Sequence, residues 1–212
     1  MRTLAVLPVK SFGLAKQRLG AAVGADERRA LARAMVGDVL EALSRVPGLD
    51  GVIVVTAEAD LPLDGVEVVH DPAEAGQSAA AALGIDAALA RGAERVLLVP
   101  GDCPALDADE VGALLADPAA GVVIVPDRHG TGTNALLLAP PTAIAPAFGP
   151  GSLARHVALA GDDARVAELP SLGLDVDTPG DLAALRAALA ARPGGAPRTR
   201  ALLDGIAAAH AA

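Results

Sequence analysis

The strongest constraint on the fold is the regular alternation of short apolar runs with longer helical patterns. Runs such as 51–56 (GVIVVT) and 95–100 (RVLLVP) are almost wholly apolar, which is typical of strands buried on both faces. Segments with helical periodicity, for example 26–46 and 77–90, separate these runs. Because alternating strands and helices form βαβ units with right-handed crossovers, the pattern predicts an α/β fold: a single three-layer domain with a mostly parallel sheet.

The same pattern predicts where the elements lie. We expect strands at 3–9, 51–56, 66–70, 95–100, 122–127, 134–140 and 165–170, and helices near 26–46, 77–90, 107–116, 152–159 and 179–191. The pattern ends at a proline- and glycine-rich stretch that begins at residue 192. We therefore predict one domain over 1–192 and a C-terminal tail over 193–212 that is partly mobile or forms a short Ala-rich helix.

Length and charge exclude several classes of protein. The 212 residues suit one α/β domain, and a net charge of −9 argues against nonspecific nucleic-acid binding, which needs a basic surface. The single cysteine, Cys103, excludes an internal disulfide and fits a reducing compartment. No apolar run approaches the roughly 20 residues that span a bilayer, and no signal peptide is visible. We expect a cytoplasmic protein that does not enter a membrane.

In such sheets ligands bind at the carboxyl ends of the strands, so the residues there are the first candidates for a site. The first strand is followed by a loop with three cations, Lys10, Lys16 and Arg18. Only two of the seventeen Lys and Arg residues are lysines, and both lie in this loop. Compact ammonium charges suit a triphosphate and a departing pyrophosphate. Chance and an ordinary solvated basic turn are the alternatives.

A strand-end aspartate follows the strand predicted at 95–100. Asp102 in PGDCPAL lies where a buried strand opens, and an unpartnered carboxylate there is costly. A bound Mg²⁺ would satisfy it, because that ion prefers one or two carboxylates plus substrate phosphates. The alternative is a helix N-cap. Cys103 beside it is interpreted as a small buried apolar residue.

A second acidic segment, LDVDTPGDL, lies late in the chain. Asp175 and Asp177 alternate in extended chain and so face the same side. Asp177 is a candidate second metal ligand, with Asp175 beside it. Capping is again the alternative, with Thr178 or Asp177 as the cap and Asp181 complementing the helix dipole. We interpret Asp181 as structural.

Two glycine-rich segments have the composition of anion-binding loops. The first, 127–136, offers backbone N–H groups and hydroxyls at Gly130, Thr131, Gly132 and Thr133. The second, 148–156, leads into a helix through Gly149, Gly151 and Ser152, with Arg155 and His156 one turn further along. A helix N-terminus preceded by glycines is a ready anion site. Each segment could instead be an ordinary turn.

A third loop, 71–84, joins a predicted strand to a helix. Gly76 would permit close backbone approach, and Gln77 and Ser78 could hydrogen-bond a purine edge or a ribose. The alternative is a plain helix cap.

The segments PVKSFGLAKQRL, GQS, PGDCPAL, DRHGTGTNAL, FGPGSLARH and DVDTPGDL together resemble the guanylyltransferase family of coenzyme F-420 biosynthesis. That family is part of the nucleotide-diphospho-sugar-transferase-like (Rossmann-like) nucleotidyltransferases, which also include molybdenum-cofactor guanylyltransferases. The likeness runs in order from about residue 3 to 190. The GDCP segment is common to the broad superfamily, whereas the basic loop, GTGTNAL and FGPGS together are much more specific.

The resemblance implies a Mg²⁺-dependent nucleotidyltransferase domain over 1–192 that joins GTP to a small phosphorylated acid and releases pyrophosphate. Carried over by residue, Asp102 and an Asp of 175–177 would hold metal, and Thr133, Gly149 and Ser152 would hold the acid. Lys10, Lys16 and Arg18 would face the triphosphate. The Gly-rich loop of the wider superfamily is replaced here by PVKSFG, so its triphosphate contacts do not carry over directly.

The favoured acceptor is phosphoenolpyruvate, because the GC-rich composition resembles that of actinobacteria, whose family members are associated with that substrate. The product would be enolpyruvoyl-2-diphospho-5′-guanosine, with possible hand-off to the downstream deazaflavin-adding transferase. The alternatives are 2-phospho-L-lactate or 3-phospho-D-glycerate as acceptor, and a larger acceptor such as molybdopterin or a sugar acid. A non-catalytic GTP-binding regulator is the alternative from another class.

Overall fold

The computed structural model describes residues 1–14, 16–20, 23–58, 61, 66–117 and 121–211. The α-helices are α1 (Ala25–Leu43), α2 (Gln77–Ala90), α3 (Ala108–Ala116), α4 (Ser152–Ala160), α5 (Pro179–Ala191) and α6 (Pro197–Ala211). The strands are β1 (Thr3–Val9), β2 (Gly51–Thr56), β3 (Glu67–His70), β4 (Arg95–Leu98), β5 (Val122–Pro126), β6 (Thr133–Leu138) and β7 (Ala164–Val166). Short 3₁₀ turns lie at Phe12–Leu14, Gln17–Leu19 and Gly161–Asp163.

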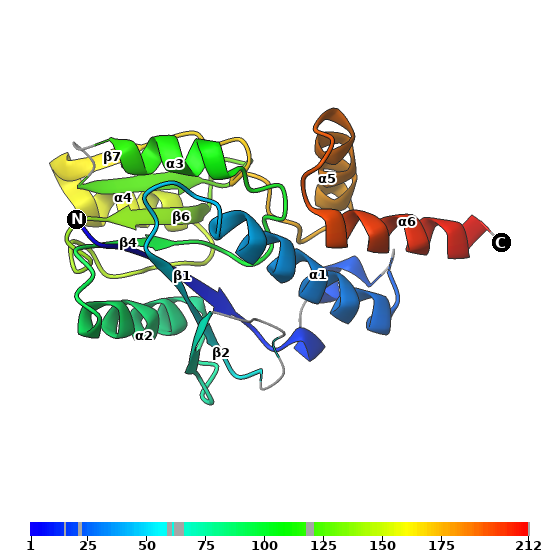
Figure 1. The fold of residues 1–212 in the computed structure, drawn as a ribbon, viewed down its shortest axis with the longest axis horizontal. Coiled ribbons are helices and arrows are strands. Elements are labelled where there is room, and N and C mark those ends of the chain that lie inside the picture. Colours follow the sequence, from blue (N-terminus) through cyan, green and yellow to red (C-terminus); the bar gives the residue numbers. More distant parts are fainter. Residues whose placement is uncertain (15, 21–22, 59–60, 62–65, 118–120, 212) are drawn as a thin grey trace.

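Seven strands form one sheet in the order β3-β2-β1-β4-β6-β5-β7, as the arrows of Figure 1 show in part. The pairs β1–β2, β1–β4, β2–β3 and β5–β7 are parallel. The predicted α/β class and mostly parallel sheet are therefore confirmed.

Strand β6 departs from that pattern, because it runs antiparallel to both β4 and β5. The connection from β5 to β6 is only residues 127–132, and a parallel crossover needs a dozen residues or more. The reversal has a functional consequence. The first residue of β6, Thr133, lies opposite Pro126 at the end of β5, so it shares an edge with the carboxyl ends of the parallel strands.

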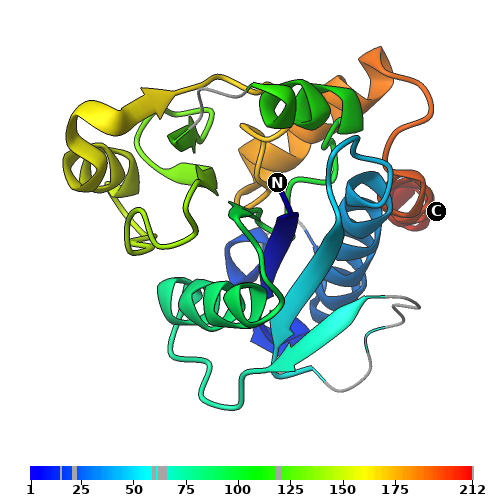
Figure 2. The ribbon, with the colours of Figure 1, turned by 60° about the vertical axis from the view of Figure 1, so that its left-hand side comes forward.

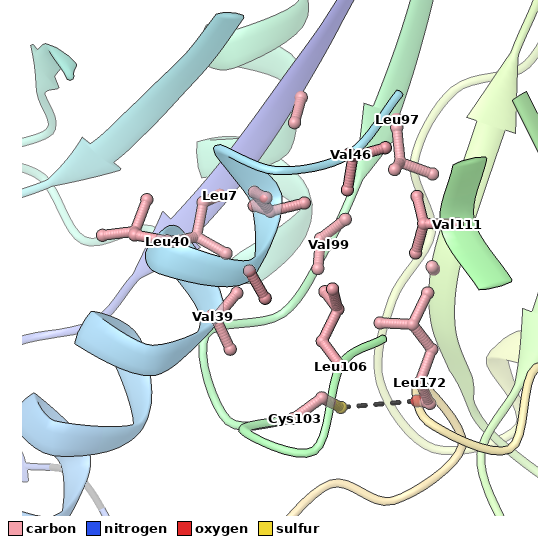
Figure 3. Packing of buried hydrophobic residues seen from close by; sticks show 14 of the residues in the cluster. Leu7, Val39, Leu40, Val46, Leu97, Val99, Cys103, Leu106, Val111 and Leu172 are labelled. Atoms are coloured by element: carbon pink, nitrogen blue, oxygen red, sulfur yellow. Dashed lines mark hydrogen bonds between the residues drawn. The ribbon is translucent and has the colours of Figure 1, made fainter. Parts of the chain in front are cut away.

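Helices cover both faces of the sheet (Figures 1 and 2). The side chains of β1 alternate between the two faces, as the twofold period of a strand requires. Leu7 packs with residues of α1 and α3, whereas Val6 packs with residues of α2. Figure 3 shows the first of these clusters, in which Leu40 of α1 and Val111 of α3 pack over the sheet.

Helix α2 packs closely against the sheet at one glycine, Gly84. A Cβ at Gly84 would stand 2.2 Å from a methyl group of Val6 and 3.0 Å from one of Val55. Real Cβ atoms do not approach other heavy atoms that closely, so a larger residue would push α2 outward. That glycine therefore permits the close packing of α2 on β1 and β2.

The C-terminal helix packs against the rest of the fold through a third apolar cluster. Leu203 and Ile206 of α6 are buried with Met35 of α1 and Leu185 of α5. Figure 2 shows α6 beside α1. The start of α6 is held by Asp38 of α1, whose carboxylate accepts hydrogen bonds from the backbone N–H groups of Arg198 (3.1 Å) and Thr199 (2.8 Å). Residues 197–211 thus form a 15-residue helix, and the predicted division into a domain over 1–192 and a tail over 193–212 stays a prediction.

Most predicted elements lie within a few residues of the observed ones, with two shorter strands. The strand predicted at 95–100 ends at Leu98, and the one predicted at 165–170 covers only Ala164–Val166. Strand β7 lies at the edge of the sheet and pairs only with β5. With a partner on one side only, fewer backbone hydrogen bonds are available to lengthen it. Within the described ranges, no helix is both long and apolar enough to cross a bilayer.

Candidate active site

An open cavity of about 620 Å³ lies where the parallel strands end and β6 begins. Its lining includes eleven of the twelve residues predicted to form the site: Lys10, Lys16, Arg18, Gly76, Gln77, Asp102, Thr133, Gly149, Ser152, Asp175 and Asp177. Segments far apart in the sequence therefore form one concave surface. Polar groups that converge in a cavity at this edge are the usual setting of a ligand site in an α/β fold.

The ammonium of Lys16 lies between two carboxylates that line this cavity. Its Nζ donates to Asp102 Oδ2 at 2.5 Å and to Asp177 Oδ1 at 2.9 Å. The Lys16 side chain is only 8% exposed. Burial by itself lowers the pKa of Lys16, but Asp102 and Asp177 outweigh it, and the pKa lies above its ordinary value. Lys16 is therefore charged at neutral pH.

The capping alternative for Asp102 is excluded, because the next helix, α3, is capped by another residue. Asp107 Oδ1 accepts from the backbone N–H groups of Asp109 (2.7 Å) and Glu110 (3.2 Å). The Asp102 carboxylate instead faces the cavity and Lys16. Its backbone carbonyl accepts from Val176 N–H at 3.2 Å, which ties the two acidic segments together.

Capping at α5 leaves Asp177 available to a ligand. Thr178 is the N-cap, and its hydroxyl accepts from Asp181 N–H at 3.2 Å. The buried Asp181 carboxylate in turn accepts from the backbone N–H groups of Asp177 (3.1 Å) and Thr178 (2.7 Å), and Arg128 Nε donates to it at 2.9 Å. Asp181 thus has the structural role predicted for it, and that role is to orient the backbone at Asp177.

Asp175 is half-buried and is held by Asn134. Its Oδ1 accepts from Asn134 Nδ2 at 3.2 Å, and the same amide group donates to the Leu172 carbonyl at 2.8 Å. Burial, together with repulsion from Asp102, raises the pKa of Asp175. A nearby cation would relieve both effects, which agrees with a place beside a metal.

Cys103 is buried, as predicted, and packs among apolar residues (Figure 3). Its Sγ donates to the Leu172 carbonyl at 3.3 Å. Burial, and then the Asp102 carboxylate, raise the pKa of the thiol well above its ordinary value. A neutral thiol enclosed in this way is no nucleophile.

The carboxylates suit a hard cation, although they do not form a complete metal site on their own. Among the described residues, no three acidic, histidine or cysteine side chains are arranged to hold a metal ion. Asp102 and Asp177 nevertheless hold a cation between them, the Lys16 ammonium. Mg²⁺ commonly takes one or two carboxylates and completes its shell with water and substrate phosphates. The donor set fits that ion, and the metal site stays a prediction.

The basic loop is anchored at its base by two glutamates. Glu74 Oε1 accepts from Ser11 N–H (2.9 Å) and from the Ser11 hydroxyl (2.7 Å), and Glu58 Oε1 accepts from Phe12 N–H (2.5 Å). Phe12 is buried in the core beside α1. These anchors hold the backbone between Lys10 and the rest of the loop. Lys10 and Arg18 are exposed and line the cavity, where their charges can meet a ligand.

The segment 127–133 differs from the prediction. We expected its backbone N–H groups to be open to a ligand, but those of Thr131 and Gly132 donate to the Asp127 carboxylate, each at 3.0 Å. Thr133 N–H donates to Ser152 Oγ at 2.8 Å. The loop satisfies its own donors because Asp127 sits at its start. Thr131 and Thr133 of this segment line the cavity, and Thr133 is the one predicted to hold the acid.

The segment 148–156 is a tight turn into α4. Gly149 and Gly151 have φ of 111° and 72°, which favour glycine. Arg155 Nη2 donates to the carbonyl of Ala147 at 3.0 Å, so its guanidinium braces the turn. Ser152, only 1% exposed, lines the cavity.

Ser78 is the one predicted site residue outside the cavity lining. Its Oγ accepts from Phe148 N–H at 2.9 Å, so it joins α2 to the turn before α4. Gly76, with φ of 108°, and Gln77 do line the cavity. The nucleotide contacts predicted for Gly76, Gln77 and Ser78 stay predictions.

Sequence reasoning missed three polar side chains that organise the site: Asp127, Arg128 and Asn134. All three lie within a segment that was singled out for its glycines and threonines. An aspartate at the start of a Gly-rich turn is a signal for a side chain that binds the following N–H groups. No local signal could have paired Arg128 with Asp181 or Asn134 with Asp175, because these pairs are 53 and 41 positions apart.

The fold has solved counterparts. A protein described as a nucleotide-diphospho-sugar transferase from Desulfovibrio desulfuricans G20 superposes with a TM-score of 0.74 at 20% identity. The match covers 98% of this chain and 96% of that one. At this identity the likeness shows the fold, and it confirms the nucleotide-diphospho-sugar-transferase-like class.

Proteins found by sequence comparison are more similar to this chain than the solved structure is. A phosphoenolpyruvate guanylyltransferase from Conexibacter woesei is 50% identical over 214 residues, with 96% of each chain covered. Another protein of that name, from Sphaerobacter thermophilus, is 42% identical over 190 residues, which cover 86% of this chain and 91% of the relative. The family model described as "Guanylyl transferase CofC like" matches residues 3–187. The chain therefore belongs to the CofC-like guanylyl transferase family.

Proposed function

We propose that this chain is a guanylyltransferase that joins GTP to phosphoenolpyruvate, giving enolpyruvoyl-2-diphospho-5′-guanosine and pyrophosphate. The observation that carries the proposal is one cavity that brings together three cations, the carboxylates of the segments after β4 and before α5, and the residues Thr133 and Ser152. The name shared by relatives at 50% and 42% identity supports phosphoenolpyruvate as the acceptor.

The reaction requires no general base from the protein. An oxygen of the phosphate of the acid, already anionic, forms a bond to the α-phosphorus of GTP. The bond from that phosphorus to the oxygen bridging to the β-phosphate breaks, and pyrophosphate leaves with its electron pair. The main barriers are the repulsion between two anions and their orientation.

The cavity residues would reduce this repulsion and orient the two substrates. Lys10, Lys16 and Arg18 would face the triphosphate and the departing pyrophosphate, where positive charge stabilises the developing negative charge. Thr133, Gly149 and Ser152, which line the same cavity, would hold the phosphorylated acid. Gly76 and Gln77 would contact the nucleoside, with Ser78 supporting the turn behind them.

Magnesium is part of the proposal. Asp102 and Asp177 would hold the ion, with Asp175 beside them. When bound, the ion would neutralise phosphate charge and polarise the phosphorus–oxygen bonds. The Lys16 ammonium, which now lies between Asp102 and Asp177, would then turn to the phosphates.

Two further expectations belong to the same proposal. The product is a reactive mixed diphosphate, so direct hand-off to the downstream deazaflavin-adding transferase would protect it from hydrolysis. A cytoplasmic location also remains part of the proposal. Absence of any kinetic coupling between the two enzymes would contradict the hand-off.

The test is pyrophosphate release by the purified protein with GTP and Mg²⁺. Phosphoenolpyruvate, 2-phospho-L-lactate and 3-phospho-D-glycerate are supplied in parallel, and ATP and CTP replace GTP as controls. Release with phosphoenolpyruvate and GTP alone supports the proposal. Release with another acid instead corrects the acceptor, and GTP binding without release with any acid contradicts the transferase function.

A further inference from the structure

His156 is a fully buried histidine in α4, and both of its ring nitrogens are hydrogen-bonded. Ala147 N–H donates to Nε2 at 2.8 Å. A backbone N–H can only donate, so Nε2 must be the unprotonated nitrogen of the ring. The proton of the neutral imidazole is therefore on Nδ1, which lies 2.9 Å from Thr133 Oγ1 and donates to it.

The neutral state of this ring follows from its surroundings. Its ring contacts are the Thr133 hydroxyl, the Ala147 amide and the edge-on ring of Phe148, with centroids 5.2 Å apart. None of these groups is charged. Burial, and then the positive charge of Arg155, lower the pKa of His156 to about 4.

The hydrogen bond that His156 Nδ1–H donates to Thr133 determines which way the Thr133 hydroxyl proton can point. A hydroxyl carries one proton and can also accept. Its accepting side is engaged by Nδ1–H, and in the part of the chain that the structure describes, no protein group accepts the Thr133 hydroxyl proton. The Thr133 backbone is fixed as well, since its N–H donates to Ser152 Oγ. Thr133 lines the cavity, so its free proton is available to a ligand there.

We propose that His156 is a positioning residue: its Nδ1–H holds the Thr133 hydroxyl as a hydrogen-bond donor toward an anionic oxygen of the phosphorylated acid. This inference rests on the proposed function for the identity of the acid. His156 touches neither substrate nor reacting atoms. Without it, the hydroxyl could turn its proton inward and present lone pairs to the anion, which would repel it.

Two matched variants separate this role from a structural one. In His156→Asn the side-chain amide N–H stands where Nδ1–H was and still donates to Thr133, while the bond from Ala147 is lost. In His156→Gln the side-chain oxygen reaches the place of Nε2 and still accepts from Ala147, while the donor to Thr133 is lost. His70→Gln, at an exposed histidine, is the control substitution.

Steady-state kinetics with phosphoenolpyruvate and GTP give the first readout. We expect His156→Gln to raise KM for the acid roughly tenfold, since a hydrogen bond to an anion is weakened, and to leave KM for GTP unchanged. His156→Asn should stay within about threefold of the unsubstituted protein. Thr133→Val should resemble His156→Gln, and the double variant should be no worse than Thr133→Val, because both changes remove one interaction. The proposal would be overturned if His156→Gln and His156→Asn raised KM for the acid equally, or if KM for GTP rose as much as KM for the acid. It would also be overturned if the effects of His156→Gln and Thr133→Val added up in the double variant.

Nitrogen NMR of the histidine rings gives a readout that needs no turnover. The proposal requires His156 to be neutral with its proton on Nδ1 at pH 7, and a proton on Nε2 would overturn it. Titration with phosphoenolpyruvate should show weaker binding to His156→Gln than to His156→Asn. If the unsubstituted protein binds the acid in this way yet releases no pyrophosphate, the proposed function fails and the inference about His156 stands.

Discussion

Lys16 and Asp102 are 86 positions apart in the sequence, yet the Lys16 ammonium donates to Asp102 Oδ2 at 2.5 Å. The contact joins the loop after β1 to the end of β4, two neighbouring strands of the sheet. It also places a protein cation where the proposed function requires a metal ion. Lys16 therefore acts as the counter-ion of Asp102 and Asp177 in this structure, and the proposed metal ion would have to displace it.

Replacing Lys16 with methionine should tighten metal binding in the absence of nucleotide. The ion no longer competes with the ammonium, so we expect the affinity for Mg²⁺ or Mn²⁺ to rise roughly tenfold, about 1.4 kcal/mol. Calorimetric titration with the metal alone measures this, with Lys10→Met as the control in the same loop. Unchanged or weaker binding would show that the ammonium does not occupy a ligand position. Turnover should fall, since the charge facing the phosphates is lost.

Asp102→Asn should reduce pyrophosphate release by orders of magnitude. The neutral amide is a poor ligand for a hard divalent cation and leaves Lys16 with one carboxylate fewer. Asp86→Asn, on the exposed face of α2, is the matched control and should leave turnover unchanged. An Asp102→Asn effect below about tenfold, or ~1.4 kcal/mol, would count heavily against a metal ligand here.

Asp181→Asn should destabilise the fold and disturb the segment that carries Asp177. Burial by itself raises the pKa of Asp181, but hydrogen bonds from Thr178 and Arg128 outweigh it and lower the pKa. The asparagine side chain has one acceptor oxygen fewer and no ion pair with Arg128. The free energy of unfolding in urea should therefore fall by about 2–3 kcal/mol. Asp162→Asn, at an exposed aspartate, should change stability by less than about 0.5 kcal/mol. Equal stability of the two variants would refute the role given to Asp181.

The buried His156 should make the protein less stable in mild acid. Its pKa is lowered from 6.5 to about 4 in the folded state, so below pH 6.5 the unfolded chain binds a proton that the folded chain does not. The stabilisation from a neutral ring is fully present above pH 6.5 and is lost as the pH falls toward 4, by on the order of 3 kcal/mol. Urea unfolding of the unsubstituted protein and of His156→Asn between pH 7 and 4 measures it. The difference between their unfolding free energies should shrink over that range, and a constant difference would contradict the assignment.

Asp38→Ala should loosen helix α6 without unfolding the domain. Two backbone N–H groups at the start of α6 lose their acceptor, which costs about 1–2 kcal/mol for a capping interaction. Amide hydrogen exchange over 197–211 should become faster than in the unsubstituted protein. Arg198→Ala removes the exposed ion pair with Glu41 and tests whether charge rather than capping holds the helix. Unchanged exchange in Asp38→Ala would show that apolar packing alone holds α6.

The positions of the elements could be predicted well because periodicity is a local property. The run GVIVVT became β2 with the predicted bounds, and the helix predicted at 179–191 is α5, since Thr178 and Pro179 mark its start in the sequence. The strand predicted at 165–170 was too long because edge position, which limits pairing, is not visible in a short run of residues.

Most of the residues proposed for the site do line one cavity, although their roles stay predictions. Strand ends share one edge of a parallel sheet, so Lys10, Asp102 and Asp177 were expected together from their places after strands and before a helix. Thr133 was predicted from its glycine-rich segment and from the resemblance, although it lies at the start of its strand and not after the end of one. Only the antiparallel direction of β6 explains why its first residue belongs to that edge.

The sequence by itself determined the alternation of strands and helices and the residue types at each strand end, because both depend on neighbours a few positions away. Tertiary structure alone decided the partners of those residues. The loop donors at Thr131 and Gly132 are taken by Asp127, Lys16 lies between Asp102 and Asp177, and His156 donates to Thr133. The physical reason is that a hydrogen bond depends on distance and direction in space. Those are set by how the crossovers and the reversal of β6 bring distant segments to one edge of the sheet.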